Sequence, residues 1–181
     1  MGVAHNMSEA RLTVDTINCL DRSAFVDAFG SLFEGSPWIA SKAWEDGPFD
    51  SVEDLHEKLC VVMYGASREQ QLALIRGHPD LVGRAALAGT LSRESTGEQA
   101  AAGLDRLSPD EIVAFNRLNT QYKERFGFPF VICARENKKE SILAGFATRL
   151  HNTPDEEIVT ALGEIARIAW YRLLDTMDED E

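Results

Sequence analysis

The sequence predicts an all-α protein, and three observations carry that prediction. Apolar residues recur at helical spacing along most of the chain, and residues that commonly cap helices precede these stretches. Only residues 128–133 form an extended apolar run, which cannot build a sheet alone. No repeat or linker divides the 181 residues. We therefore predict one all-α domain of seven to eight helices over residues 1–181, with frayed ends at 1–15 and 176–181.

Four helices are expected in the first half of the chain. Each begins at a Ser or Asp, whose side chain accepts a hydrogen bond from a free N–H group of the first turn. The expected starts are Asp21 to Ser23, Ser36-Pro37, Ser51 with Asp54, and Ser67 with Gln70, the last of these helices ending at Gly77.

Four more helices are expected in the second half. Between the two sets, residues 77–95 show no clean helical period, and long irregular connections in compact domains tend to be functional. The expected starts are Ser95 with Glu98 (ending at Gly103), Ser108-Pro109 with Glu111 (ending at Gly127), a site near Asn137, and Thr153-Pro154 with Glu156.

The charge balance argues against nucleic-acid and membrane partners. The chain has 18 Lys and Arg against 30 Asp and Glu, which gives a net charge of −12. Binding to phosphates or to an anionic membrane surface needs clustered Lys and Arg, and no such cluster occurs. No run approaches the ~18 apolar residues of a membrane span.

The cysteines and histidines predict neither disulfides nor a metal site. Cys19, Cys60 and Cys133 are odd in number and far apart, which fits a protein of the reducing cytoplasm. His56 begins a pattern like that of zinc-protease helices, but Cys60 stands where the second histidine would be needed. The glycine-rich nucleotide signatures and the serine-hydrolase elbow are absent, so no cofactor is expected.

His78 is the most informative histidine, because it lies between Gly77 and Pro79. A residue that precedes proline is disfavoured in the α region, so we expect the ring to be displayed at a loop. The nearby helix C-terminus favours the imidazolium, with a pKa near or above ~6.5, and would let the ring donate a proton. The plainer interpretation is a histidine in a surface turn.

Ser95 and Glu98 allow two interpretations. They match an ordinary capping box, in which both side chains bind backbone N–H groups. A helix start also offers free N–H donors, which can hold a carboxylate or carbonyl of a substrate.

The extended run and the last helix also allow more than one interpretation. Residues 128–132 are either plain core or a strip whose backbone groups pair with the amide edge of a flat heterocycle. Arg167 and Arg172 lie five positions apart on one predicted helix, and therefore about 140° apart around it. At most one of them is expected to line a given pocket.

Several short segments stand in an order that is typical of one known family. They are His78-Pro79-Asp80-Leu81, Ser95-Thr96-Gly97-Glu98-Gln99, Ala102-Gly103-Leu104, Leu118-Asn119 with Tyr122, and Phe126-Gly127-Phe128-Pro129-Phe130-Val131-Ile132. Together they resemble the OHCU decarboxylase family, where OHCU is 2-oxo-4-hydroxy-4-carboxy-5-ureidoimidazoline. The similarity extends from about Phe25 to Arg172-Leu173 and covers most of the chain.

The resemblance implies an all-α lyase without a cofactor that acts in uric acid degradation. It would release CO2 from OHCU to give (S)-allantoin, commonly as a homodimer. The family's catalytic positions fall on His78, Glu98 and Arg172, with Arg167 as the competing assignment for the arginine. Its substrate-binding positions fall on Pro79, Ser95, Thr96, Gly97, Glu98, Gln99, Phe130, Val131, Ile132, Cys133 and Ala134.

The chemistry of OHCU agrees with the absence of cofactor motifs. The ring carries its own electron sink beside the carboxylate-bearing carbon, so the protein has to position the substrate and move a proton. We assign His78 as the acid/base and Glu98 as an acceptor from the hydroxyl or ureido group. Two rival functions remain open at this stage, an acidic all-α interaction module without a pocket and a Ser/His hydrolase that uses Ser95 and His78.

Overall fold

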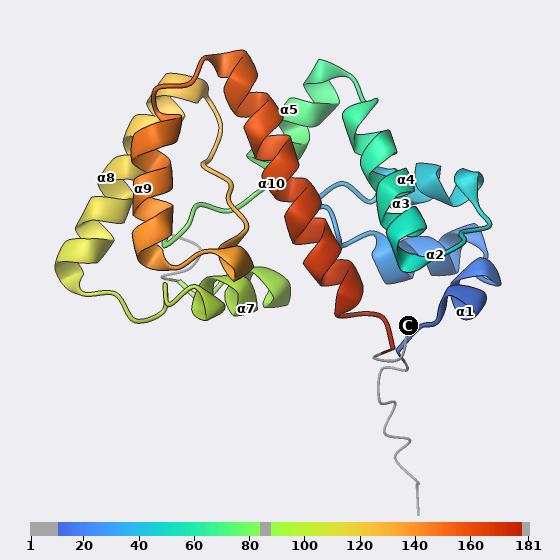
Figure 1. Ribbon diagram of the computed structural model, residues 1–181. Helices are drawn as coiled ribbons and strands as arrows, with labels where there is room; N and C mark the ends of the chain where they lie inside the picture. Colours follow the sequence, from blue (N-terminus) through green and yellow to red (C-terminus); the bar gives the residue numbers. More distant parts are fainter. Residues whose placement is uncertain (1–10, 84–87, 179–181) are drawn as a thin grey trace, which may run out of the picture.

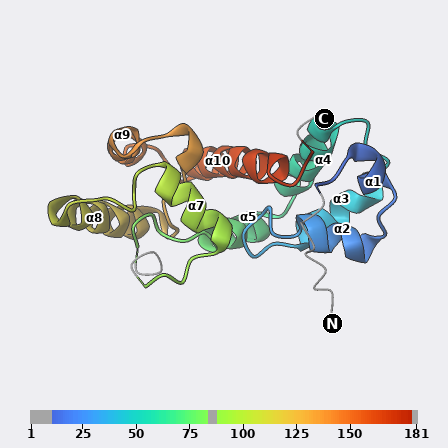
Figure 2. The same ribbon diagram turned by 90° about the horizontal axis from the view of Figure 1, so that it is seen from below.

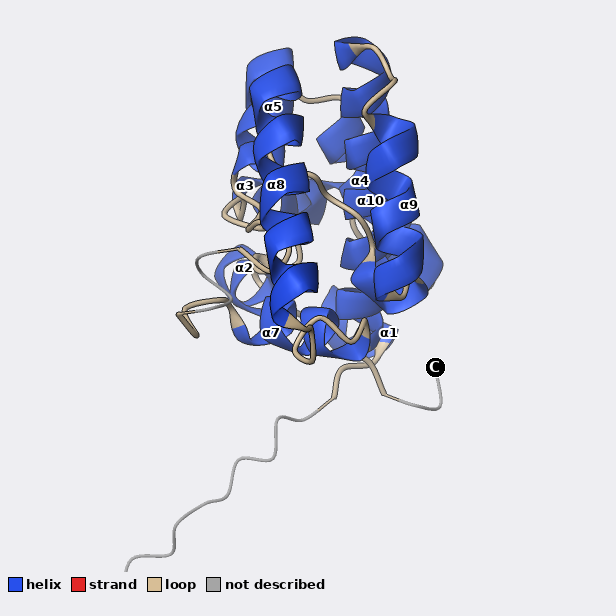
Figure 3. Cartoon of the chain, turned by 90° about the vertical axis from the view of Figure 1, so that its left-hand side faces the viewer, coloured by secondary structure: helices blue, strands red, loops and turns tan. Residues whose placement is uncertain are grey.

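The computed structural model describes residues 11–83 and 88–178, and within these ranges the regular structure is helical (Figure 1). No strand occurs there, and Figure 3 shows only helices joined by loops. The all-α prediction is confirmed, and seven of the nine α-helices described have eight residues or more. The helices are α1 (Val14–Asn18), α2 (Arg22–Phe29), α3 (Trp38–Ala43), α4 (Val52–Tyr64), α5 (Arg68–Arg76), α7 (Arg93–Ala101), α8 (Pro109–Phe126), α9 (Lys139–Arg149) and α10 (Pro154–Leu174).

The long helix α10 runs through the middle of the molecule and connects its two sides. Helices α1 to α4 gather at one end of it, and α8 and α9 lie at the other (Figure 1). Helix α10 packs against α4 and α5, while α8 packs against α9. In the view from below, α7 lies across the space between α10 and α5 (Figure 2). Residues of α7, α5 and α10 can therefore meet in one place.

Local sequence signals set most helix ends. The capping boxes of α5, α8 and α10 form as predicted, because both the side chain of the cap and that of the third helical residue bind backbone N–H groups. Gly127 ends α8 in the left-handed conformation, with φ at 76°. The residues of these boxes are Ser67 with Gln70, Ser108 with Glu111, and Thr153 with Glu156.

Two predicted caps are wrong. The cap of helix α7 is Ser92, three residues earlier than the expected Ser95, because the Ser92 hydroxyl accepts from the Ser95 N–H at 3.1 Å and the helix begins at Arg93. Ser95 and Glu98 therefore lie inside the helix, where their side chains are free for other partners. The Ser36 cap is also wrong, since Pro37 occupies the cap position of α3 and no side chain bonds there.

The described parts of the two chain ends are joined, although we expected frayed ends at 1–15 and 176–181. The Leu12 N–H donates to the Thr176 carbonyl at 3.0 Å, and the Asp178 N–H donates to the Leu12 carbonyl at 3.1 Å. Residues 1–10 and 179–181 lie outside the described residues. None of the helices that the structure describes is both long and apolar enough to cross a membrane.

Candidate active site

His78 lies directly after α5, where the chain turns tightly. Gly77 caps the helix, and a Cβ atom there would stand 3.2 Å from the Glu34 carbonyl oxygen. Glycine therefore lets the loop that follows α2 approach the end of α5. The His78 ring folds back onto α5, where its Nδ1 lies 3.0 Å from the Leu74 carbonyl oxygen.

The ring of His78 is buried, so the prediction of a displayed, protonated imidazole is wrong. Only 8% of the residue is exposed. Burial lowers the pKa of His78 to about 4, although the hydrogen bond to Leu74 and the charge of Glu34 both act to raise it. The carbonyl group at the end of α5 raises the pKa of His78, as predicted, but the loss of hydration lowers this pKa by more.

A neutral ring beside a carbonyl oxygen has a defined tautomer. The Leu74 carbonyl oxygen can only accept a hydrogen bond. Nδ1 of His78 therefore carries the proton and donates a hydrogen bond to this oxygen. The other ring nitrogen, Nε2, then has a free lone pair. His78 is therefore placed to act first as a base at neutral pH.

Arg172 on α10 forms a two-pronged ion pair with Glu98 on α7. Nε lies 2.7 Å from one Glu98 oxygen and Nη2 lies 3.0 Å from the other. Nη2 also reaches the Ser95 hydroxyl at 3.4 Å. Burial alone would lower the pKa of Arg172, but the hydrogen bonds and charge of Glu98, together with Glu34, raise it above its ordinary value. The guanidinium is therefore permanently charged.

The structure decides between the two arginines of α10. Arg172 is 4% exposed and points at α7, whereas the Arg167 side chain is 57% exposed and pairs with Glu164 on its own helix. The sequence predicted that only one of them could face a pocket, and that one is Arg172.

Glu34 is a member of this cluster that sequence reasoning missed. It lies in the loop between α2 and α3, and one of its oxygens accepts from Arg172 Nη1 at 2.9 Å. The Ser95 hydroxyl donates to its other oxygen at 3.3 Å. No local pattern marks Glu34, because its partners stand 138 and 61 positions away.

Gln99 holds the loop that follows His78. Its Oε1 accepts from the Val82 N–H at 3.1 Å, and its Nε2 donates to the Asp80 carbonyl at 3.5 Å. Val82 has a φ of 54°, which is a costly conformation for a β-branched residue. The hydrogen bond from Val82 to Gln99 helps to maintain this turn.

The extended strip of residues 128–133 contributes Val131 and Ile132 to the same pocket as His78, and part of its backbone remains available. The Val131 carbonyl accepts from Arg149 Nη1 at 2.6 Å, and the Cys133 N–H donates to Glu164 at 2.8 Å. In the described part of the chain, the N–H groups of Val131 and Ile132 have no acceptor. These two donors fit the predicted role of the strip.

Nine of the predicted site residues line one small pocket. Leu81 and Ile168 line it too and were not predicted, although Ile168 lies one helical turn before Arg172 and its spacing could have revealed it. The predicted residues in the pocket are His78, Pro79, Ser95, Glu98, Gln99, Val131, Ile132, Ala134 and Arg172.

Four predicted binding residues do not line this pocket. Thr96 and Gly97 lie on the exposed side of α7, where the Thr96 hydroxyl donates to the Ser92 carbonyl at 2.9 Å. The Phe130 ring packs in the core against Phe146, and the Cys133 side chain is buried outside the pocket lining.

The pocket is narrow in this structure. The space open to water between its side chains is about 30 Å³, which is enough for one or two water molecules. A heterocyclic ligand therefore requires some of the lining groups to give way.

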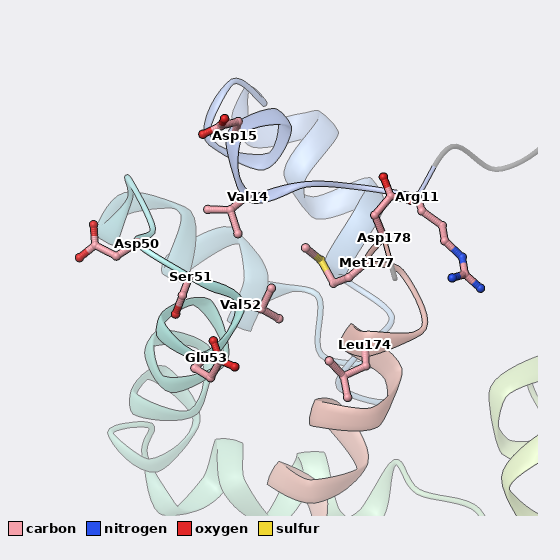
Figure 4. A pocket seen from close by; sticks show the side chains of 10 residues that line it. All are labelled: Arg11, Val14, Asp15, Asp50, Ser51, Val52, Glu53, Leu174, Met177 and Asp178. Carbon is pink, nitrogen blue, oxygen red and sulfur yellow. The ribbon is translucent and has the colours of Figure 1, made fainter. Parts of the chain in front are cut away.

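A separate hollow lies between the described N-terminal residues, the start of α4 and the residues that follow α10 (Figure 4). Its lining includes the acids Asp15, Asp50 and Glu53, and it shares no residue with the pocket around His78. Within residues 11–83 and 88–178, no group of three or more His, Cys, Asp or Glu side chains is arranged to hold a metal ion.

Comparison with known proteins gives the family. The model of the OHCU decarboxylase family matches residues 18–174. The chain belongs to this family. A relative from Haloferax volcanii, named 2-oxo-4-hydroxy-4-carboxy-5-ureidoimidazoline decarboxylase, is 41% identical over 93% of this chain and 98% of its own. A relative of the same name from Mus musculus is also 41% identical, over 89% of this chain and 90% of its own.

A solved structure has a similar fold. The crystal structure of an (S)-allantoin synthase superposes with a TM-score of 0.75 and 26% sequence identity. The match covers 92% of this chain and 55% of the other. This member of the OHCU decarboxylase family thus has the family's fold, with the pocket around His78 as its candidate active site.

Proposed function

We propose that this protein decarboxylates OHCU to (S)-allantoin in uric acid degradation. The observation that carries the proposal is the pocket around His78, which brings together a neutral histidine, a buried arginine–glutamate pair and two residues, Val131 and Ile132, whose N–H groups have no acceptor among the described residues. The names of the relatives, which include OHCU decarboxylases and an (S)-allantoin synthase, support it.

Each feature of OHCU has a matching group in the pocket. The guanidinium of Arg172 suits the carboxylate, because it is permanently charged and its N–H groups form strong hydrogen bonds with carboxylates. The oxygens of Glu98 each accept one hydrogen bond from Arg172 and retain lone pairs for a ureido N–H. The free N–H groups of the strip suit a ring carbonyl oxygen.

The reaction then needs one base and one proton delivery. When the bond between C4 and its carboxylate breaks, its electron pair forms a double bond between C4 and C5, and the electron pair of the neighbouring C=N bond moves onto the ring nitrogen. That nitrogen takes a proton from water, and the product of this step is an enol. His78 Nε2 accepts the hydroxyl proton of the enol and returns it to C5. Delivery from one fixed face yields one enantiomer, and this role supplies a rate factor of ~10²–10⁴.

No cofactor is part of this proposal. The C=N bond of the substrate accepts the electron pair that another decarboxylase would pass to a cofactor. The protein's contribution is orientation in a water-poor pocket and the proton transfer by His78.

The rival functions receive less support from the geometry. A Ser/His hydrolase needs a hydrogen bond from the nucleophile to its base, but the Ser95 hydroxyl donates to Glu34 and the His78 ring bonds Leu74. An interaction module has no need for a buried cluster of one arginine and two glutamates, which is costly to desolvate.

Assembly and location belong to the proposal as well. We propose a homodimer in the cytoplasm, on the strength of the family resemblance and of the unpaired cysteines. Light scattering after size-exclusion chromatography tests the dimer, and a mass equal to one chain of 20.1 kDa would contradict it. Cell fractionation tests the location.

Circular dichroism during OHCU decay tests the activity. Spontaneous decay gives a racemate, which has no dichroic signal, so a signal that grows in proportion to protein concentration reports catalysis. Unchanged dichroism together with an unchanged rate of OHCU loss would contradict the proposed function.

A further inference from the structure

Every donor of Arg172 is occupied in this structure. An arginine has five N–H groups, and five acceptors lie within hydrogen-bond distance of its nitrogens. They are the two oxygens of Glu98 at 2.7 and 3.0 Å, Glu34 at 2.9 Å, and the Ser95 hydroxyl and Ser31 carbonyl at 3.4 Å each. A substrate carboxylate can therefore reach Arg172 only by replacing one of them.

The two carboxylates are not held equally. Glu98 bonds Arg172 through both oxygens and projects from α7, with 9% of its side chain exposed. Glu34 bonds it through one oxygen, comes from the loop after α2, and is 18% exposed. Glu34 is the partner that is easier to replace, because only one of its bonds comes from Arg172, its bond from Ser95 is long at 3.3 Å, and its more exposed side chain can turn toward water.

The charge of the cluster favours the same exchange. Two carboxylates surround one guanidinium, and His78 is neutral, so an anionic substrate would add a third negative charge around Arg172. Like charges at such distances in a water-poor site are strongly unfavourable. Release of Glu34 as the substrate binds keeps two carboxylates on Arg172 throughout.

We propose that Glu34 occupies the place of the substrate carboxylate on Arg172 and is displaced by it. The proposal rests on the proposed function, because it takes the substrate to be a carboxylate. Glu34 is then a positioning residue that acts through Arg172 and the Ser95 hydroxyl. When CO2 leaves, the product has no carboxylate to hold Arg172, and the return of Glu34 favours product release.

Two stable ligands that differ only in a carboxylate measure how much this group contributes to binding. We would measure binding of 2-oxoimidazolidine-4-carboxylate and of 2-imidazolidinone, which is the same ring without the carboxylate, by calorimetry or ligand-observed NMR. Neither ligand turns over, so the measurement is independent of decarboxylation. Failure of the wild type to form allantoin would count against the proposed function, whereas these affinities test Glu34.

The test variant is Glu34→Gln, which removes the charge and keeps the shape. The matched control is Glu94→Gln, which removes an equal charge from the exposed start of α7 at a residue with no bond to Arg172. If Glu34→Gln fails to fold, Glu34→Ser replaces it with the same expected direction.

The expected result is tighter binding of the carboxylate ligand to Glu34→Gln, by about fivefold or more, because a charged competitor for Arg172 is gone. Binding of 2-imidazolidinone should not change, and Glu94→Gln should behave like the wild type. The KM for OHCU should fall in Glu34→Gln, while kcat should not rise.

Three results would overturn the proposal. Weaker or unchanged binding of the carboxylate ligand to Glu34→Gln would mean that Glu34 does not compete for Arg172. An equal gain in affinity for the carboxylate ligand in Glu94→Gln would assign the effect to the overall negative charge of the protein. Failure of the carboxylate ligand to bind either the wild type or Glu34→Gln would remove Arg172 as the carboxylate site.

Discussion

His78 owes its chemical state to two neighbours in the chain and to a pocket built from distant elements. Gly77 and Pro79 turn the chain away from α5, and the ring then folds back to donate to Leu74. Burial lowers its pKa to about 4, so the ring is neutral across the physiological range. A neutral ring with Nδ1 already bonded presents Nε2 as a base, and this sets the sign of the pH dependence.

The pH profile of kcat/KM should therefore fall on the acidic side. A required neutral group with a lowered pKa is fully active above that value and loses activity as the pH falls through about 4. The initial rate of OHCU loss between pH 3.5 and 8, corrected for the spontaneous rate and checked for folding at each pH, gives the curve. Loss of kcat/KM as the pH rises through 6 to 7 would show instead that imidazolium is the required form.

Glu98→Gln should lower both activity and stability. Glu98 is not a helix cap but half of a buried ion pair, so the change leaves Arg172 with one charged partner fewer. Glu34 remains, and we expect a loss of about 2 kcal/mol in the free energy of unfolding. Urea unfolding measures it, with the exposed Glu94→Gln on the same helix as the control. Wild-type values of both unfolding free energy and turnover in Glu98→Gln would contradict this role.

At the scale of the helices, the features that sequence reasoning predicted are local ones. A capping box needs residues only three positions apart, as in Ser67 with Gln70, so it can be read from the chain. The angular separation of Arg167 and Arg172 is equally local, and it correctly limited the pocket to one of them. The start of α7 differs from the prediction because Ser92 and Ser95 are both residue types that cap helices, and Ser92 is the one that does so.

The features that sequence reasoning missed depend on contacts between distant elements. The burial of His78 is imposed by α7, α10 and the strip, none of which is adjacent to it in the chain. Glu34 joins the site because the loop after α2 lies against the end of α5, close to Gly77. Neither fact has a signature within a few residues.

The strip is held in place by a second buried ion pair. Arg149 on α9 donates to the Val131 carbonyl at 2.6 Å and to Glu157 at 2.6 Å. Its guanidinium lies 4.2 Å from the centre of the Phe130 ring. Glu157 is fully buried, and Arg149 is the cation that pairs with it.

Arg149→Met should destabilise the protein and loosen the strip. We expect a loss of about 3 kcal/mol or more, because Glu157 is left buried without its cation, and a raised KM for OHCU. Urea unfolding and steady-state rates measure the two effects. The double variant with Arg149→Met and Glu157→Gln should have a higher free energy of unfolding than Arg149→Met alone, because the unpaired buried charge is removed. Strict additivity of the two single changes would contradict the coupling.

At the scale of the whole molecule, the described fold brings α5, α7, α10 and the strip around one site without a cluster of metal-ligating side chains. We expect exhaustive dialysis against EDTA to leave turnover unchanged, because His78 and the substrate's own ring supply the chemistry. The rate of (S)-allantoin formation before and after chelation measures this. Activity that disappears on chelation and returns with zinc would contradict a mechanism without a metal.

The central claim is that His78 delivers the proton from one face of the pocket. The most direct test is the enantiomeric composition of allantoin formed from fresh OHCU by the wild type and by His78→Asn, in which the Asn amide can still donate to Leu74. The wild type should give one enantiomer. His78→Asn should stay folded, lose ~10²-fold or more in kcat, and leave mainly the racemate of the spontaneous reaction. A folded His78→Asn that kept the wild-type rate and still produced a single enantiomer would contradict the account.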